Sequence, residues 1–217
     1  MARTLLLDLD GTLVDTVPDL AAALNRMMAG HDLAPFTHPE TAAMVGDGVA
    51  VLVRRAFAAR GQVPDDATIA GFASDYGAHA AVESRLFPGI AGLLRDLIAE
   101  DWHLAICTNK PEAAARSLLD ALGLTPMLRA VGGGDSFPVR KPDPAHLLAT
   151  LRAAGGTVAS AIMVGDHAND VAAARGAGVK SVFVTWGYGP LAMAEGAGAV
   201  VATPAELLDA LRRLLPA

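Results

Sequence analysis

Apolar runs of strand length alternate with segments of helical periodicity through most of this 217-residue chain, and this alternation restricts the fold more than any other feature. Strands that alternate with helices favour a parallel, doubly wound α/β sheet with right-handed crossovers. The predicted strands cover approximately residues 3–10, 103–108, 128–132, 161–166, 181–184 and 199–201. The helices predicted between them cover residues 89–100, 112–122, 144–154 and 169–176, and a last helix begins at Pro204.

One block of the chain interrupts the alternation after its first strand. The helical spacing of its apolar residues predicts helices and no intervening strand. These helices cover approximately residues 17–30, 39–45, 49–59 and 66–83. A run of helices inside an α/β pattern indicates an inserted unit. We therefore expect an α/β core of residues 1–15 plus 86–217 and a helical cap of residues 16–85.

The first strand ends in two carboxylates, Asp8 and Asp10, which are followed at once by Gly11 and Thr12. Side chains at i and i+2 of an extended chain lie on the same face, so these two like charges repel each other in a closed pocket. A Mg²⁺ ion bound by hard oxygen ligands would relieve that repulsion. The alternative is a strand that enters an ordinary Asp-Gly turn.

Polar residues also follow three other predicted strands, and the carboxyl ends of parallel strands are where such sheets bind ligands. Thr108 and Asn109 precede a helix, where they could bind a phosphate or simply cap the helix. Lys141, between prolines, is either a fixed point charge or a solvated loop lysine. Asp166 ends an apolar strand, where a charge is unfavourable unless a partner or ligand compensates it. Asp170 lies in the first turn of the next helix, where the helix dipole favours a negative charge.

Composition excludes several classes of function. A net charge of −6 without a basic cluster speaks against nucleic acid or an anionic membrane as the partner. Cys107 is the only cysteine, which excludes a disulfide framework, and its apolar surroundings predict a buried, inert thiol. No apolar run approaches the roughly 18 residues of a membrane span, and Asp8 interrupts the N-terminal run too early for a signal peptide. We expect a cytoplasmic protein.

Together these residues resemble the four motifs of the haloacid dehalogenase superfamily, in the same order along the chain. The motifs are Asp8-x-Asp10-Gly11-Thr12, Thr108-Asn109, Lys141-Pro142 and Gly165-Asp166-x-x-x-Asp170. Within the superfamily the sequence is similar to the phosphoglycolate phosphatase group. That similarity includes Gly46-x-Gly48 with Arg55-Ala56, Gly133-Gly134-Asp135 and Trp186-Gly187-Tyr188-Gly189.

The resemblance implies a Rossmann-like core, an inserted cap, and Mg²⁺ bound by Asp8, the backbone carbonyl of Asp10 and Asp166. One departure is His167, where the family more often has a small hydroxyl residue. This histidine either lines the metal loop or faces solvent, and we expect it to face solvent.

The motif spacing also suggests roles in phosphoryl transfer. Asp8 would attack the phosphate and carry it as an aspartyl-phosphate. Asp10 would protonate the leaving oxygen and later take a proton from water, with Thr12 orienting it. Lys141, the Thr108 hydroxyl and the Asn109 N–H would bind phosphoryl oxygens. Asp170 would hold Lys141 or a metal-bound water.

The cap is expected to select the ester. Gly46 and Gly48 could approach the substrate closely while Arg55 pairs with a carboxylate, or the three could form an interhelical turn with a solvated arginine. The predicted reaction is Mg²⁺-dependent hydrolysis of a small phosphorylated metabolite, with 2-phosphoglycolate the first choice. Alternatives are another small ester such as a sugar phosphate or pyrophosphate, a sugar phosphomutase, and, from a different class, a phospho-accepting receiver. The sequence leaves monomer or homodimer undecided.

Overall fold

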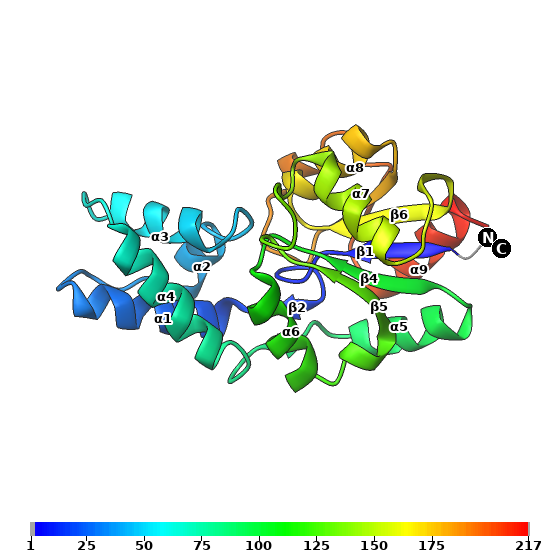
Figure 1. Ribbon diagram of the computed structural model, residues 1–217. Helices are drawn as coiled ribbons and strands as arrows, with labels where there is room; N and C mark the ends of the chain where they lie inside the picture. Colours follow the sequence, from blue (N-terminus) through cyan, green and yellow to red (C-terminus); the bar gives the residue numbers. More distant parts are fainter. Residues whose placement is uncertain (1–2, 217) are drawn as a thin grey trace.

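The structure, a computed structural model, describes residues 3–216 and has a parallel sheet at the centre of its larger lobe (Figure 1). Within that range the sheet has six strands in the order β5-β4-β1-β6-β7-β8. Their bounds are β1 Thr4–Leu7, β4 His103–Cys107, β5 Leu128–Gly132, β6 Ala161–Gly165, β7 Lys180–Val184 and β8 Ala199–Val201. The predicted doubly wound α/β fold is confirmed. Residues 1, 2 and 217 of the expected core lie outside the described residues.

The chain reverses its direction of winding at β1, which pairs with β4 on one side and with β6 on the other. Strands β4 and β5 extend the sheet one way, and β6 to β8 extend it the other way. Ligands bind outside the carboxyl ends of strands at such a switch point. The residues that follow β1, β4 and β6 therefore lie where a sheet of this topology binds its ligand.

Helices cover both faces of the sheet, as Figure 1 shows. The alternation of side chains along β1 sends Leu5 and Leu7 into one apolar cluster and Leu6 into the other. The first cluster includes residues of α5, α6 and α9, and the second includes residues of α7 and α8. The bounds are α5 Ile90–Ala99, α6 Glu112–Ala121, α7 Pro144–Ala153, α8 Ala168–Ala177 and α9 Pro204–Leu214.

The remaining helices form a lobe beside the sheet, coloured from blue through cyan to blue-green in Figure 1. They are α1 Val17–Gly30, α2 His38–Ala42, α3 Val49–Ala58 and α4 Asp66–His79. This lobe has an apolar cluster of its own, which contains Leu24, Met28, Phe57 and Phe72. Separate clusters support the expected division into core and cap, and the boundaries at residues 15/16 and 85/86 remain a proposal.

Two chain segments join the lobes, and they form a small ribbon that the sequence pattern did not predict. Strand β2 (Val14–Asp15) pairs antiparallel with β3 (Arg85–Leu86). Beside the ribbon, buried Asp19 accepts hydrogen bonds from the backbone N–H groups of Glu83 (2.9 Å) and Ser84 (2.8 Å) and from the Ser84 hydroxyl (2.7 Å). One carboxylate thus ties the outgoing segment to the returning one.

Some predicted element ends were wrong. The first strand stops at Leu7 rather than at residue 10, because Gly11 donates a backbone hydrogen bond to Val14 and closes a turn. The last cap helix ends at His79 instead of residue 83, where the chain turns toward the Asp19 contacts. Short 3₁₀ helices at Thr125–Met127, Val158–Ser160 and Leu191–Ala194 were not predicted.

Candidate active site

The carboxyl ends of the central strands bring the predicted motif residues together. Asp8 follows β1, Thr108 follows β4 and Asp166 follows β6, while Lys141 lies in the loop before α7 and Asp170 in the first turn of α8. All five are at least nine-tenths buried. Residues far apart in the sequence thus form one polar cluster at the switch point of the sheet.

Lys141 lies between two carboxylates of this cluster. Its ammonium is 2.9 Å from Asp8 Oδ1 and 2.6 Å from Asp170 Oδ1, and its side chain is only 1% exposed. Burial alone would lower the pKa of Lys141, but the charges of Asp170 and Asp8 outweigh burial and hold the pKa above its ordinary value. Lys141 is therefore a fixed positive charge beside Asp8, and the alternative of a solvated loop lysine is wrong.

Asp166 accepts hydrogen bonds but pairs with no basic side chain among residues 3–216. Its carboxylate accepts hydrogen bonds from the Thr12 hydroxyl (2.9 Å) and from the backbone N–H of Tyr188 (2.7 Å). Burial, and then the charge of Asp8, raise the pKa of Asp166 to about 6. The Thr12 hydroxyl therefore orients Asp166, and the prediction that it orients Asp10 is wrong.

The carboxylates of Asp8, Asp166 and Asp170 offer oxygen atoms that all lie within 4.8 Å of one another. Lys141 neutralises only part of this charge, and Asp166 remains ionised at neutral pH at an energetic cost. Converging hard oxygen ligands with an excess of negative charge are the donor set that a divalent cation prefers. The residues present fit a divalent metal.

Glycines allow the chain to wrap closely around Asp166. A Cβ atom on Gly11, whose φ is +82°, or on Gly187 would lie 2.4 Å from Asp166 Oδ2. A Cβ on Gly189 would lie 1.9 Å from the Asp166 carbonyl oxygen. No side chain fits at these distances, so the Gly11 turn and the Trp186–Gly189 segment are shaped around this carboxylate.

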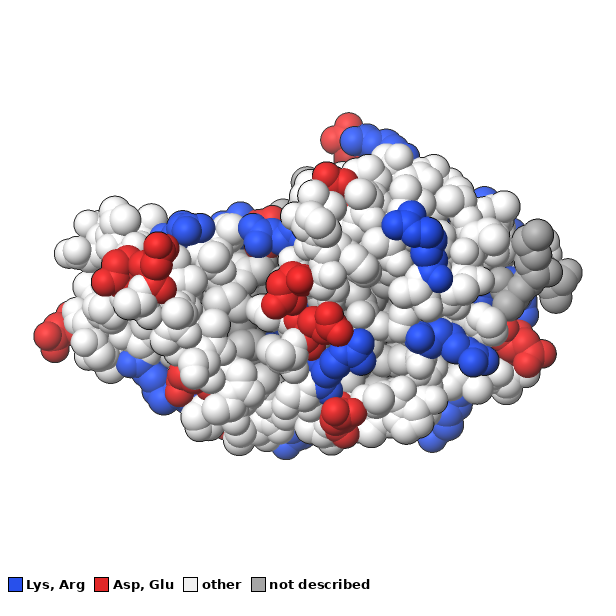
Figure 2. All heavy atoms as spheres, viewed as in Figure 1, with Lys and Arg blue, Asp and Glu red and all other residues white. Residues whose placement is uncertain are grey.

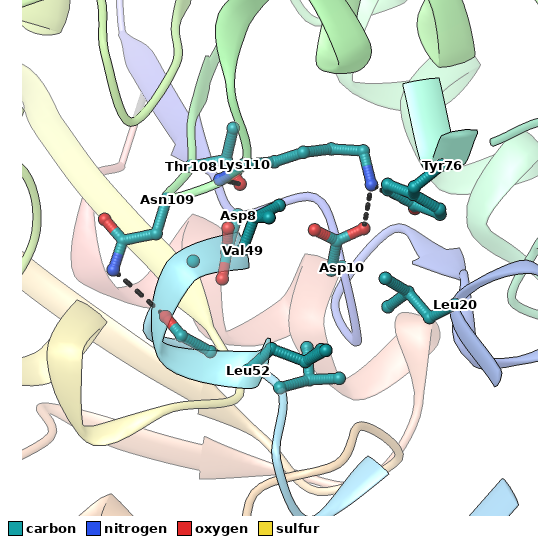
Figure 3. A pocket seen from close by; sticks show the side chains of 12 residues that line it. Asp8, Asp10, Leu20, Val49, Leu52, Tyr76, Thr108, Asn109 and Lys110 are labelled. Atoms are coloured by element: carbon teal, nitrogen blue, oxygen red, sulfur yellow. Dashed lines mark hydrogen bonds and ion pairs between the residues drawn. The ribbon is translucent and has the colours of Figure 1, made fainter. Parts of the chain in front are cut away.

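Asp10 contacts a different cation, Lys110, which the sequence interpretation did not select. The Lys110 ammonium lies 3.0 Å from Asp10 Oδ1, donates a hydrogen bond to the Tyr76 hydroxyl, and lies 4.3 Å from the centre of the Tyr76 ring (Figure 3). The Lys110 side chain is 2% exposed. The carboxylate and the phenol outweigh burial and keep the pKa of Lys110 above its ordinary value.

A small cavity between cap and core connects these groups. From the core it is lined by Asp8, Asp10, Thr108, Asn109 and Lys110, and from the cap by Leu20, Val45, Gly46, Gly48, Val49, Leu52 and Tyr76. Its volume is about 40 Å³, on a measure by which one water molecule needs about 10–15 Å³. The predicted Gly46 and Gly48 do lie at the cavity.

The cap loop around Gly46 contacts the core through two asparagines. The Asn109 side-chain amide donates to the carbonyl oxygens of both Gly46 and Lys141, each at 3.0 Å, and Asn169 donates to Asp47 at 2.7 Å. Asn109 therefore joins the cap loop to the loop that carries Lys141. Its side chain holds the two lobes together at the cavity wall.

Two further residues that the sequence singled out are Arg55 of the cap and His167 of the core. Arg55 does not line the cavity; its guanidinium pairs with Asp47 and donates to the Met44 carbonyl at 3.0 Å. His167 is half-buried rather than solvent-facing, because its ring packs against Gly46, where a Cβ would lie 2.6 Å from it. His167 also caps α8, accepting a hydrogen bond from the Asn169 backbone N–H.

The predicted burial of Cys107 is confirmed, and its inertness stays a prediction. Cys107 is fully buried, and burial raises its pKa to about 12. Its sulfur lies 3.5 Å from His146 Nδ1, and His146 Nε2 lies 2.9 Å from the Gly133 carbonyl oxygen, to which it donates as the neutral ring. These contacts support the loop beneath Lys141 rather than forming a nucleophile.

The fold and this cluster define a class of protein. A sequence model of the haloacid dehalogenase-like hydrolases matches residues 5–184. The chain belongs to this family.

Among the described residues, no helix is long and apolar enough to cross a membrane.

Individual relatives show which group within the family this chain resembles. The phosphoglycolate phosphatase of Agrobacterium fabrum is 44% identical over 97% of this chain and 89% of its own length. The phosphoglycolate phosphatase of Cereibacter sphaeroides is 42% identical over 96% of this chain and 97% of its own. A crystal structure of a predicted phosphoglycolate phosphatase from Haemophilus somnus has a TM-score of 0.87 at 29% identity, covering 96% of this chain and 97% of that one. The chain is phosphoglycolate phosphatase-like in sequence and in fold.

Proposed function

We propose that this enzyme hydrolyses 2-phosphoglycolate to glycolate and phosphate, with Mg²⁺ and an aspartyl-phosphate intermediate. The broader statement, that the chain is a phosphoric monoester hydrolase, follows from its family and its relatives. The observation that carries the proposal is the buried Asp8, which lies beside Lys141 and Asp166 and lines a small cavity between cap and core.

Asp8 is the proposed nucleophile. Lys141 holds its carboxylate in place and offers positive charge where the phosphoryl oxygens would lie. Asp8, the backbone carbonyl of Asp10 and Asp166 would hold Mg²⁺, whose charge offsets the repulsion between a carboxylate and an anionic ester. Asp170 positions Lys141 through the 2.6 Å ion pair. The Thr108 hydroxyl and the Asn109 N–H are proposed donors to the phosphoryl oxygens.

Asp10 is the proposed acid and base. It lies beside Asp8 on the cavity wall, so its carboxyl can give a proton to the leaving oxygen and later take one from the attacking water (Figure 3). Replacement by asparagine removes both proton transfers. We expect phosphoenzyme formation and breakdown both to be slow in Asp10→Asn, and unchanged turnover would contradict this role.

The experiment is a phosphate-release screen over small esters, with and without Mg²⁺. We expect 2-phosphoglycolate to be preferred, activity to require the metal, and Asp8→Asn to be inactive. Preferred release from a sugar phosphate or from pyrophosphate would replace the substrate assignment. Isomerised sugar phosphate without free phosphate would indicate a mutase, and a stable phosphoprotein without turnover a receiver. A cytoplasmic location is part of the proposal.

A further inference from the structure

We propose that Lys110, held by Tyr76 of the cap, binds a carboxylate on the leaving group and so makes the enzyme selective for phosphate esters of small 2-hydroxy acids. This inference rests on the proposed function, because it concerns the same cavity. Lys110 directly follows the motif residues Thr108 and Asn109 and has no role in the phosphoryl transfer described above.

The charges around the cavity favour this assignment. Among the cavity-lining residues of the described chain, Lys110 is the one with a basic side chain, and most of the cap-side wall is aliphatic. An anionic group that entered beside Leu20, Val49 and Leu52 would lose its water, and burial of an unpaired charge is strongly unfavourable. The Lys110 ammonium has three N–H donors, and Asp10 and Tyr76 accept two of them, so one donor is left to compensate a second negative charge on the substrate.

The position of Lys110 matches the chemistry of a 2-phospho acid. Asp10, which would protonate the ester oxygen, lies 3.0 Å from the Lys110 ammonium. Figure 3 shows the ammonium on the side of Asp10 that is turned away from Asp8. In 2-phosphoglycolate a single methylene separates the ester oxygen from the carboxylate. An ester with its phosphorus at Asp8 and its bridging oxygen at Asp10 therefore directs its carboxylate toward Lys110.

Arg55, the residue predicted to pair with the carboxylate, is not available for this role. Its guanidinium does not line the cavity and instead hydrogen-bonds with Asp47 and the Met44 carbonyl. The cap contributes through Tyr76 instead. This tyrosine on α4 is 1% exposed, stacks with Phe72, and its hydroxyl accepts a hydrogen bond from the Lys110 ammonium. A rigid partner from the cap thus fixes the cation in the core.

The test compares two esters that differ at one group. Ethyl phosphate has a methyl where 2-phosphoglycolate has its carboxylate. For the Mg²⁺-loaded wild type we expect a higher kcat/KM with 2-phosphoglycolate. Lys110→Met should reduce the ratio of kcat/KM for 2-phosphoglycolate to kcat/KM for ethyl phosphate by about 10- to 100-fold, since a hydrogen bond to a charged group is lost with only one of the esters. Any effect that passes through Asp10, 3.0 Å from the Lys110 ammonium, acts on both esters and cancels in this ratio. Arg54→Met, on the exposed face of α3, is the matched control and should preserve the ratio.

Two results would overturn the proposal. If Lys110→Met reduced the activity toward both esters by the same factor, Lys110 would act on Asp10 and not on a carboxylate. If Arg55→Met abolished the preference and Lys110→Met did not, the arginine would be the recognition residue. If Lys110→Met fails to fold, Tyr76→Phe takes its place in the test, because it removes only the hydroxyl that binds the Lys110 ammonium. It should raise KM for 2-phosphoglycolate about 3- to 10-fold more than KM for ethyl phosphate, with a smaller effect on kcat.

A binding experiment separates this inference from the proposed function. Asp8→Asn protein loaded with Mg²⁺ is titrated with each ester in a calorimeter, so no turnover is needed. Tighter binding of 2-phosphoglycolate that disappears in Asp8→Asn/Lys110→Met supports carboxylate recognition even if the wild type released phosphate from neither ester. Equal affinities for the two esters would refute it, even if the wild type proved to be an active phosphatase.

Discussion

Replacement of Lys141 by methionine is expected to destabilise the metal-free protein by about 3–5 kcal/mol, the usual effect of removing one partner from a buried ion pair. The Lys141 side chain is 1% exposed, and its partners Asp8 and Asp170 are 10% and 2% exposed. Methionine has a similar length but no charge, so both carboxylates lose their cation. We expect the upper part of the range, because Asp170 is almost completely buried and cannot recover its hydration.

Urea unfolding in the presence of a chelator, followed by tryptophan fluorescence, measures this loss. Lys180→Met is the matched control, since Lys180 is exposed and lies at the start of β7; it should change the unfolding free energy by less than about 0.5 kcal/mol. Adding Asp170→Asn to Lys141→Met removes one unpaired carboxylate and should recover about 2 kcal/mol.

Two outcomes would refute the reasoning. A loss below about 1 kcal/mol in Lys141→Met would mean that the cation does not stabilise the cluster. If the losses of unfolding free energy in Lys141→Met and Asp170→Asn simply added in the double variant, the two residues would not interact in solution.

Lys141→Met should also reduce kcat by about 10²- to 10³-fold, the effect of losing a preorganised charge at the reacting group. Phosphate release with saturating substrate and Mg²⁺ provides that value.

Other predictions follow from the remaining buried groups. Asp19→Ala should lower the unfolding free energy by about 2–4 kcal/mol in urea titrations, because the N–H groups of Glu83 and Ser84 lose their acceptor; a change below about 1 kcal/mol would contradict the tie between the two connecting segments. Burial lowers the pKa of His146, so its contribution to stability is present above its unfolded pKa of about 6.5 and is lost as the pH falls through its lower folded pKa. Urea titrations at about pH 8 and about pH 5 should therefore show a smaller decrease in His146→Gln than in the wild type. Since burial raises the pKa of Cys107 to about 12, iodoacetamide should label this thiol at about pH 8 only after unfolding, as mass spectrometry of the intact protein can show.

The residues at the strand ends could be located from sequence because topology and motif order act together. Parallel strands bring their carboxyl ends to one edge, so Asp8, Thr108 and Asp166 had to lie near each other once the alternation of strands and helices was recognised. Asp170 followed from its place one helical turn after Asp166. The sheet itself was predictable because its apolar runs have the length of strands and alternate with segments of helical spacing.

Contacts between the cap and the core could not be predicted in this way. Tyr76 lies in a helix where an aromatic residue normally fills a core, and nothing local distinguishes the hydroxyl that binds Lys110. The sequence is compatible with Arg55 as a carboxylate ligand, and the ion pair with Asp47 becomes evident only in the structure. The β2–β3 ribbon has two residues in each strand, too few to produce a periodic pattern. Such features depend on how two lobes meet, which the spacing of residues within one lobe does not encode.

The central claim is that Asp8 carries the phosphoryl group, and rapid acid quenching of the reaction with 2-phosphoglycolate and Mg²⁺ tests it most directly. Peptide mass spectrometry of the quenched protein locates the modification. We expect one added phosphoryl group on the peptide that contains Asp8, its accumulation in Asp10→Asn if breakdown is slowed more than formation, and its absence in Asp8→Asn. Full turnover with no phosphorylated peptide, or a phosphoryl group on another residue, would contradict it.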